Sequence, residues 1–284
     1  MAADLEGRVF VVTGANTGIG RVTAVELARR GGHVVLACRS RERTAEVLDQ
    51  IRRETGSDRG EYCEIDLGSF ASIRRAAARL LAVERPIHVL VNNAGLAGRR
   101  GRTEDGFELA FGVNHLGHFL LTNLLRERLI RSSPSRVVTV ASAAHARAKG
   151  IDFEAVRRPT ASVTGIPEYS VSKLANVLFS AQLARQLSGS GVTTYAVHPG
   201  VVASDLWRGV PWPIRPILGL FMISSEQGAK TTLHCATAPD LTRESGLYYD
   251  QCAPRKPSRF ARDEELARRL WSFSAEATGV GEAP

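Results

Sequence analysis

The chain has 284 residues, of which 44% are hydrophobic, and this length suits one α/β domain, residues 1–284, with a substantial core. No stretch approaches the roughly 20 apolar residues that cross a bilayer, and no secretory signal precedes the first expected strand, so no transmembrane anchor is expected. The net charge of +8 comes mostly from scattered arginines without an RRM, helix-turn-helix or zinc-finger pattern, so no nucleic-acid partner is expected.

The first expected strand, residues 8–13, is an apolar, β-branched run that is typical of a buried parallel strand. It leads into Gly14-Ala-Asn-Thr-Gly18-Ile-Gly20 and a helical pattern that Gly31-Gly32 closes. A strand, a glycine-rich turn and a helix N-terminus form a site for a dinucleotide pyrophosphate, because backbone N–H groups and the helix dipole face the phosphates. The spacing differs from the G-x-G-x-x-G fingerprint. A turn that only reverses the chain is the alternative.

The second expected strand, residues 33–38, bears on the choice of coenzyme. An acidic residue about 20 residues past the glycines would bind the ribose 2′-hydroxyl of NAD, whereas an arginine accommodates a 2′-phosphate. No acidic residue appears until Glu42, and Arg39 stands at the end of the strand. The sequence therefore favours NADP(H) over NAD(H). A solvated, basic helix start, with Arg41 and Arg43 close by, is the alternative.

Strands and helices alternate along the rest of the chain without repeats or long linkers. This predicts an α/β fold: a Rossmann-type, doubly wound, mainly parallel sheet of seven strands with helices on both faces. Further strands are expected over 61–65, 87–91, 135–141, 192–198 and 246–250. Helices are expected over 18–31, 41–55, 69–83, 106–131, 168–188, 225–238 and 263–275. We expect residues 1–135 to bind the coenzyme and residues 136–284 the substrate, outside the carboxyl ends of the strands.

Tyr169 and Lys173 stand four residues apart in an expected helix, so their side chains share one face. An ammonium beside the phenol favours the phenolate and lowers a tyrosine pKa that is otherwise about 10. Such a phenol can exchange a proton with a substrate oxygen. The same spacing also occurs where both residues only cover surface. His115, His118 and His145 stand at no metal-ligand or triad spacing, and we expect them to pack or form hydrogen bonds.

The segment 201–224 follows the expected strand 192–198 and is rich in proline and apolar residues, among them Trp207, Trp212 and the run from Ile217 to Ile223. We interpret it as a lid over an apolar substrate, because long loops beside the ligand end of a sheet are usually functional. A helix in a subunit interface and a helix on a membrane surface are the alternatives.

The four cysteines show no C-x-x-C or metal-ligand spacing. They are Cys38, Cys63, Cys235 and Cys252. We expect free thiols in a reducing compartment, no metal site and a cytoplasmic location.

Together these motifs resemble the short-chain dehydrogenase/reductase family. The turn Gly14–Gly20 resembles the coenzyme turn of that family, Asp66-Leu67 the pair that contacts adenine, and residues 92–95 the Asn-Asn-Ala-Gly element beside the coenzyme. Residues 198–202, His-Pro-Gly-Val-Val, resemble the turn beside the nicotinamide. The coenzyme-binding residues that the resemblance implies are Gly14, Asn16, Thr17, Gly18, Ile19, Gly20, Arg39, Asp66, Leu67, Asn93, Ala94, Gly95, Tyr169, Lys173, Pro199, Gly200 and Val202.

Four residues match the catalytic tetrad of the family in order: Asn114, Ser142, Tyr169 and Lys173. The resemblance implies that Ser142 hydrogen-bonds the carbonyl oxygen while Tyr169 supplies the proton as hydride reaches the carbon. It also implies that Lys173 lowers the tyrosine pKa and holds the nicotinamide ribose, and that Asn114 supports a water relay.

Longer matches, such as Gly-Val-Asn-His-Leu-Gly-His-Phe over 112–119, are similar to the retinol dehydrogenase branch, to which WW-domain-containing oxidoreductases are related. That branch mostly uses NADP(H) on retinoids and other apolar carbonyl compounds, which implies a small apolar carbonyl or alcohol substrate. Its vertebrate members usually begin with a hydrophobic anchor, where this chain starts on the first strand, and often have Ser-Ser where this chain has Ala141-Ser142. The resemblance implies a homodimer or homotetramer through the helices that carry Asn114 and Tyr169, and it leaves peripheral membrane contact open.

Two other functions compete with a carbonyl reductase. A regulatory protein that senses NADP(H) without turnover would not need all four tetrad residues. A sugar-nucleotide epimerase can share Tyr-x-x-x-Lys, but the G-x-x-x-G-x-G spacing and an apolar segment 201–224 without diphosphate-binding groups argue against it.

Overall fold

An eight-stranded sheet forms the centre of the molecule in the computed structural model. The structure describes residues 4–200 and 223–281, without the side chains of residues 242 and 243. The strands are β1 (Val9–Thr13), β2 (His33–Cys38), β3 (Gly60–Glu64), β4 (Val89–Asn92), β5 (Ser135–Val140), β6 (Val192–His198), β7 (Leu247–Asp250) and β8 (Ala253–Arg255). Their order across the sheet is β3-β2-β1-β4-β5-β6-β7-β8, and all neighbours are parallel except β7 and β8. The predicted doubly wound sheet is confirmed. The antiparallel β8 is an addition, because three residues are too short to show a period.

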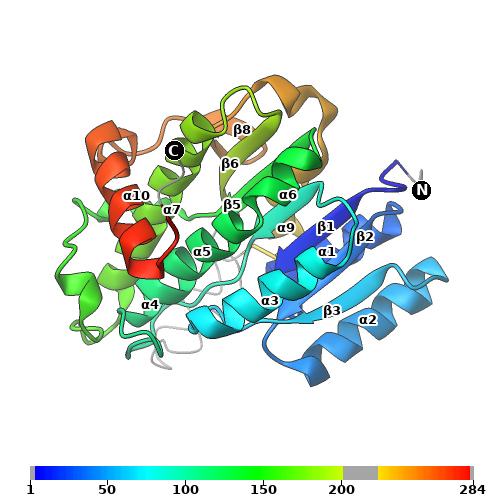
Figure 1. Cartoon of the computed structure of the whole chain (residues 1–284), viewed down its shortest axis with the longest axis horizontal. Coiled ribbons are helices and arrows are strands. Elements are labelled where there is room, and N and C mark those ends of the chain that lie inside the picture. The colour runs from blue at the N-terminus through cyan, green and yellow to red at the C-terminus, as the bar shows by residue number, and fades with distance from the viewer. Residues whose placement is uncertain (1–3, 201–222, 282–284) are drawn as a thin grey trace.

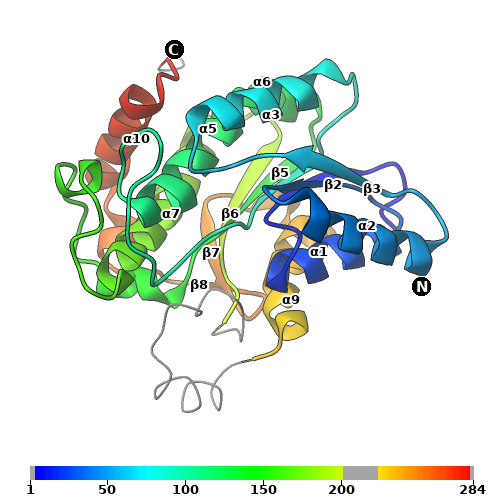
Figure 2. The ribbon, with the colours of Figure 1, turned by 90° about the horizontal axis from the view of Figure 1, so that it is seen from below.

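Helices cover both faces of the sheet (Figures 1 and 2). The longer ones are α1 (Gly18–Arg29), α2 (Arg41–Thr55), α3 (Phe70–Ala82), α5 (Gly117–Leu124), α6 (Arg126–Arg131), α7 (Ile166–Gln186), α9 (Ser225–Thr237) and α10 (Glu264–Thr278). In Figure 2, α1, α2 and α9 lie below the sheet, and α3, α5, α6, α7 and α10 lie on its other side. No helix within 4–200 and 223–281 combines the length and apolar character that a membrane crossing needs.

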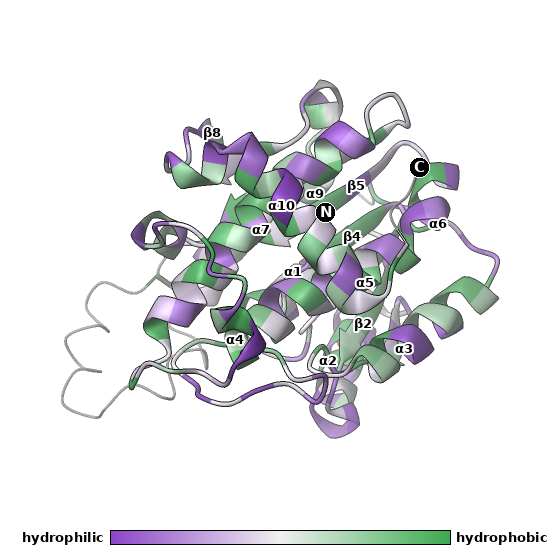
Figure 3. Ribbon diagram, turned by 60° about the vertical axis from the view of Figure 1, so that its left-hand side comes forward, coloured by the Kyte–Doolittle hydropathy of each residue, from purple (hydrophilic) through white to green (hydrophobic). Residues whose placement is uncertain are grey.

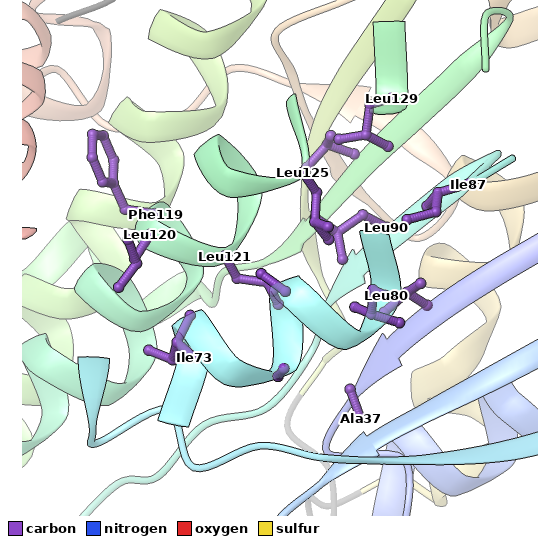
Figure 4. Packing of buried hydrophobic residues seen from close by; sticks show 14 of the residues in the cluster. Ala37, Ile73, Leu80, Ile87, Leu90, Phe119, Leu120, Leu121, Leu125 and Leu129 are labelled. Carbon is purple, nitrogen blue, oxygen red and sulfur yellow. The ribbon is translucent and has the colours of Figure 1, made fainter. Parts of the chain in front are cut away.

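Alternating side chains of the strands supply two cores, as the period of two requires. In β1, Phe10 and Val12 pack with α1 and α2, whereas Val11 faces the core of α3, α5 and α7. Figure 4 shows the second core, where Ile73 and Leu80 of α3 meet leucines of α5 and β4. The buried residues of α3 recur every three or four positions, so hydrophobic and hydrophilic residues fall on different sides of it (Figure 3).

The expected helix 106–131 is divided in the structure. It consists of α4 (Leu109–Phe111), a π-helical turn η1 (Gly112–Leu116), α5 and α6. The amide of Gly117 donates to the carbonyl of Gly112, five residues earlier. An extra residue per turn shifts the side chains around the axis, and such π turns are frequent at functional sites. Here the turn contains Asn114.

The helix α7 is enclosed within the molecule. Every residue from Ser172 to Ser180 is buried. One side faces the sheet, and α10 covers another: the ring of Trp271 stacks on Phe179 at 6.0 Å and meets the edge of Phe119 at 4.9 Å. A helix with buried residues all round is held rigidly by its surroundings.

Candidate active site

A cavity of about 710 Å³ opens where the parallel strands β1, β2, β4, β5 and β6 end. It is lined by every predicted coenzyme-binding position within the described residues, and by Ser142. Val202, and the expected lid apart from Ile223 and Ser224, lie outside the described residues. Asn114 does not line the cavity but lies fully buried beneath it. The cavity therefore collects motifs that are up to about 180 residues apart in the sequence.

Two glycines shape the turn after β1. Gly14 has a φ of +64°, in the left-handed region that disfavours side chains. At Gly20, in the first turn of α1, a Cβ would come within 3.0 Å of the Gly14 carbonyl oxygen and of Asn93 Nδ2. Both positions thus need glycine, one for its conformation and one for space. The first turn of α1 contains no acidic residue, so its positive end faces the cavity uncompensated.

Asn93 and Thr13 fasten this turn to β4. Asn93 Nδ2 donates to the carbonyl oxygen of Thr13 at 2.8 Å. The Thr13 hydroxyl oxygen accepts from the amides of Asn93 and Ala94, at 2.9 and 3.0 Å. The Asn-Asn-Ala-Gly element therefore holds the coenzyme turn from behind, as the resemblance implied.

Basic residues gather at the outer end of the cavity, beyond β2. Arg39 is 76% exposed and its Nη1 lies 3.6 Å from Asp66 Oδ2. Ser40 and Arg43 also line the cavity, and Ser40 Oγ accepts from the amide of Arg43 at the start of α2. The sequence did not predict Ser40 and Arg43 as site residues, although their place just after the end of β2 could have indicated them. Arg41 turns away and lies over the ring of Tyr62 at 4.8 Å.

Lys173 lies at the other end of the cavity with its side chain almost completely buried. Its Nζ donates to the carbonyl oxygen of Val140, the last residue of β5, at 2.8 Å. Burial lowers the pKa of Lys173 from 10.5 to about 7. The buried amine therefore loses its proton far more easily than an exposed lysine does.

Tyr169 lies one turn before Lys173, and the lysine Nζ is 5.6 Å from the centre of its ring. Burial raises the pKa of Tyr169, and a side-chain hydrogen bond with Ser142 opposes the rise. The expectation that Lys173 lowers this pKa differs from the result for the protein alone. The reason is that burial is the largest influence on this phenol, and the hydrogen bond that opposes it comes from Ser142.

Asn114 connects the π turn to α7. Its Oδ1 accepts from the amide of Leu96 at 2.9 Å, and its Nδ2 donates to the carbonyl of Leu96 at 3.0 Å and to Ser172 Oγ at 2.9 Å. Ser172 Oγ in turn donates to the carbonyl oxygen of Tyr169 at 2.7 Å. The Asn114 amide thus fixes the loop after β4 and the first turns of α7 together.

Two histidines hold the loop that follows Ser142. His145 Nδ1 donates to the Ser142 carbonyl at 2.7 Å, and its Nε2 accepts from the amide of Ser258 at 3.1 Å. His198 Nδ1 accepts from the amides of Ala143 and Gly200, both at 3.3 Å. Burial lowers the pKa of both histidines, which keeps the accepting nitrogens free of protons. The prediction of a hydrogen-bonding role is confirmed for His145.

The thiols and possible metal ligands add no further chemistry. All four cysteines are free, and three of them are buried. Within the described part of the chain, no three His, Cys, Asp or Glu side chains gather in a way that could hold a metal ion.

Comparison with known proteins identifies the family. The model of the short chain dehydrogenase family matches residues 8–211. The chain is 45% identical to retinol dehydrogenase 13 from Homo sapiens, over 99% of this chain and 87% of that protein. It is 46% identical to human retinol dehydrogenase 11, over 97% of this chain and 87% of that protein.

A solved structure agrees with these relatives. The crystal structure of an uncharacterised protein from Mycobacterium paratuberculosis superposes with a TM-score of 0.80 and 34% identity, covering 100% of this chain and 99% of that one. The chain therefore belongs to the short-chain dehydrogenase/reductase family and is an oxidoreductase similar to the retinol dehydrogenases.

Proposed function

We propose that this protein is an NADP(H)-dependent oxidoreductase that interconverts an apolar, retinal-like aldehyde or ketone and the corresponding alcohol, with Tyr169 as general acid and base. One observation carries the proposal. Ser142, Tyr169 and Lys173 meet at one end of a single cavity, and Arg39 and Arg43 stand at its other end. Such an arrangement suits a long dinucleotide whose reactive ring lies beside a proton donor.

The residues around the turn fit a dinucleotide. Gly20 lets the turn fold closely on itself, because a Cβ there would collide with the Gly14 carbonyl oxygen, and the N-terminus of α1 offers backbone N–H groups to an anion. When bound, NADP(H) supplies or accepts the hydride. Asn93 and Thr13 keep the turn in place for it through the hydrogen bonds described above.

The preference for NADP(H) rests on Arg39 and Arg43. A guanidinium matches a phosphate with two parallel hydrogen bonds, and no acidic side chain precedes Glu42 at the end of β2 to bind a free 2′-hydroxyl. Arg39 has one acidic neighbour, Asp66, at 3.6 Å, a distance at which an exposed pair contributes little. An incoming phosphate would therefore compete with it readily.

The proton chemistry belongs to Ser142, Tyr169 and Lys173. The Ser142 hydroxyl donates to the carbonyl oxygen of the substrate and orients it. Tyr169 donates its phenolic proton to the same oxygen during reduction and accepts it during oxidation. Because burial raises the pKa of Tyr169, the phenol is protonated before reduction begins. Lys173, with a pKa of about 7, can restore the lost proton at neutral pH.

The substrate class and the location are proposed from the relatives and from the thiols. Similarity to retinol dehydrogenases over nearly the whole chain supports an apolar substrate. The four free thiols support a reducing compartment, and we propose the cytoplasm.

A steady-state screen tests the proposal. NADPH and NADH are each offered with retinal, medium-chain aldehydes and aromatic ketones, and we expect turnover with NADPH. Tyr169→Phe should lower kcat by about 10²-fold or more while the Kd for NADPH stays the same, since general acid–base catalysis contributes about that much. Tyr62→Phe, outside the cavity, is the matched control.

The variants also separate the competing functions. Retained turnover in Tyr169→Phe would remove the phenol from the mechanism. Tight NADPH binding without turnover on any carbonyl would favour a sensing protein. Arg39→Ala and Arg43→Ala should each raise KM for NADPH and leave KM for NADH unchanged. An equal effect on both coenzymes would contradict the assignment of the 2′-phosphate site.

A further inference from the structure

His118 lies completely buried between the coenzyme turn and the tetrad. It stands in α5, one turn after Asn114, and only 1% of its surface is exposed. Its Nδ1 lies 3.0 Å from the carbonyl oxygen of Asn114, and its Nε2 lies 2.9 Å from the hydroxyl oxygen of Thr13. One imidazole thus touches the residue that precedes the coenzyme turn and a member of the tetrad.

The partners determine where the His118 proton sits. A carbonyl oxygen only accepts, so Nδ1 must carry the hydrogen and donate it to Asn114. Burial lowers the pKa of His118 to about 4, so the ring is neutral at physiological pH and Nε2 has a free lone pair. The Thr13 hydroxyl therefore donates to Nε2 at 2.9 Å, with the carbonyl oxygen of Val91 as a second, longer acceptor at 3.3 Å, and its own oxygen accepts from the amides of Asn93 and Ala94.

A continuous line of hydrogen bonds results. It begins at the amides behind the coenzyme turn, passes through the Thr13 hydroxyl and the His118 ring, and ends at the π turn. From there the Asn114 side chain continues it through Ser172 to the backbone of Tyr169. Each hydroxyl and imidazole group in this line donates one bond and accepts at least one, so removing one member loses a buried hydrogen bond on each of its sides.

We propose that His118 is a positioning residue that holds the coenzyme turn and the tetrad in a fixed relation through its two ring nitrogens. It touches neither substrate nor coenzyme, because it does not line the cavity. Its Nε2 acts on coenzyme binding through Thr13, and its Nδ1 acts on the proton-transfer residues through Asn114.

His115 shows that burial alone does not give this role. It is equally buried and stands three residues earlier, but its Nε2 lies 2.9 Å from Ser274 Oγ of α10, and its Nδ1 has no hydrogen-bond partner. Its ring packs among Phe111, Phe119 and Phe179 on the side away from the turn. His115→Phe is therefore a matched control for the loss of a buried histidine.

Two isosteric variants separate the two nitrogens. His118→Asn keeps a donor at the position of Nδ1 and loses the acceptor for Thr13, so we expect the Kd for NADPH to rise about 3- to 10-fold with little change in kcat. His118→Gln keeps an acceptor near Nε2 and loses the donor to Asn114, so we expect kcat to fall about 3- to 10-fold with little change in Kd. His118→Asn should add nothing further to the effect of Thr13→Val, because both remove the same bond.

The positioning role of His118 rests on the proposed function only where it is tested through kcat. The Kd is measured by titrating NADPH fluorescence, without any carbonyl substrate. In addition, ¹⁵N NMR of the unmodified protein should show a neutral His118 with its hydrogen on Nδ1 at pH 7. A hydrogen on Nε2, or equal effects of both isosteric variants and of His115→Phe on Kd and kcat, would overturn the inference. Absence of turnover with an altered Kd would instead count against the proposed function alone.

Discussion

The burial of Lys173 lowers the stability of the folded protein. Burial lowers its pKa from 10.5 to about 7, a difference of about 3.5. Because the folded pKa lies below the unfolded value, the unfolded chain binds the proton more tightly between these two pH values. The contribution of Lys173 to stability is therefore least unfavourable above pH 10.5 and becomes more unfavourable as pH falls to 7, by about 1.4 kcal/mol per unit and about 5 kcal/mol in total.

Lys173→Met removes this cost and keeps an unbranched side chain of similar length. Losing the hydrogen bond to Val140 costs about 1 kcal/mol, and the carbonyl keeps a partner because Asn176 Nδ2 also donates to it, at 3.1 Å. We expect the coenzyme-free variant to be more stable by about 3–4 kcal/mol at pH 7. At pH 9, which is about 1.5 below the pKa of an unfolded lysine, the cost of burial is smaller, so the gain falls to about 1 kcal/mol. Turnover should be lost.

Urea unfolding followed by circular dichroism, without coenzyme, measures both gains. Lys149→Met replaces an exposed lysine and serves as the control, with no gain expected at either pH. A Lys173→Met variant that is less stable at pH 7, or whose gain is equal at pH 7 and pH 9, would refute the reasoning that burial governs this lysine.

Three further changes should follow from the contacts described. Gly20→Ala should weaken NADPH binding at least about tenfold in a fluorescence titration, because the added Cβ collides with the turn. Unaltered affinity would contradict this. Gly281→Ala, where a Cβ would enter open space, is the control. Burial lowers the pKa of His115 to about 3 and of His118 to about 4. The free energy of unfolding, measured with urea, should therefore fall by about 3 kcal/mol per pH unit as the pH falls from 6.5 to 4. A flat profile would show that these rings are not held neutral. Trp271→Ala should lower the unfolding free energy by about 3–5 kcal/mol, and a loss below about 1 kcal/mol would mean that α10 is not anchored by its ring stack.

The sequence predicted the parts of the site that depend on local patterns. The turn around Gly14 and Gly20 needs glycine for reasons of backbone shape and space, and those needs appear directly in the amino-acid types. Asp66, Asn93 and Ser142 were assigned through the resemblance to the family, and their places just after strands agree with it, because the ends of parallel strands meet at one edge.

Other parts depend on contacts between distant residues. The π turn at Asn114 is not visible in a helical period, because the amide of Gly117 and the backbone of Leu96 establish it. The partner of His118 in β1 is 105 residues away. The Tyr-x-x-x-Lys spacing predicts a lowered pKa for Tyr169, whereas burial, which is a property of the folded chain, raises it.

The enclosure of α7 bears on whether the specific activity of the enzyme changes with its concentration. The resemblance implies that family members pair two copies through the helices that carry Asn114 and Tyr169. In this chain α10 already lies against α7, and nine consecutive residues of α7, Ser172 to Ser180, are buried within a single molecule. Contacts from within the same chain thus already cover this part of α7. We expect specific activity to stay constant on dilution, since no association step is needed to keep Tyr169 and Lys173 in place.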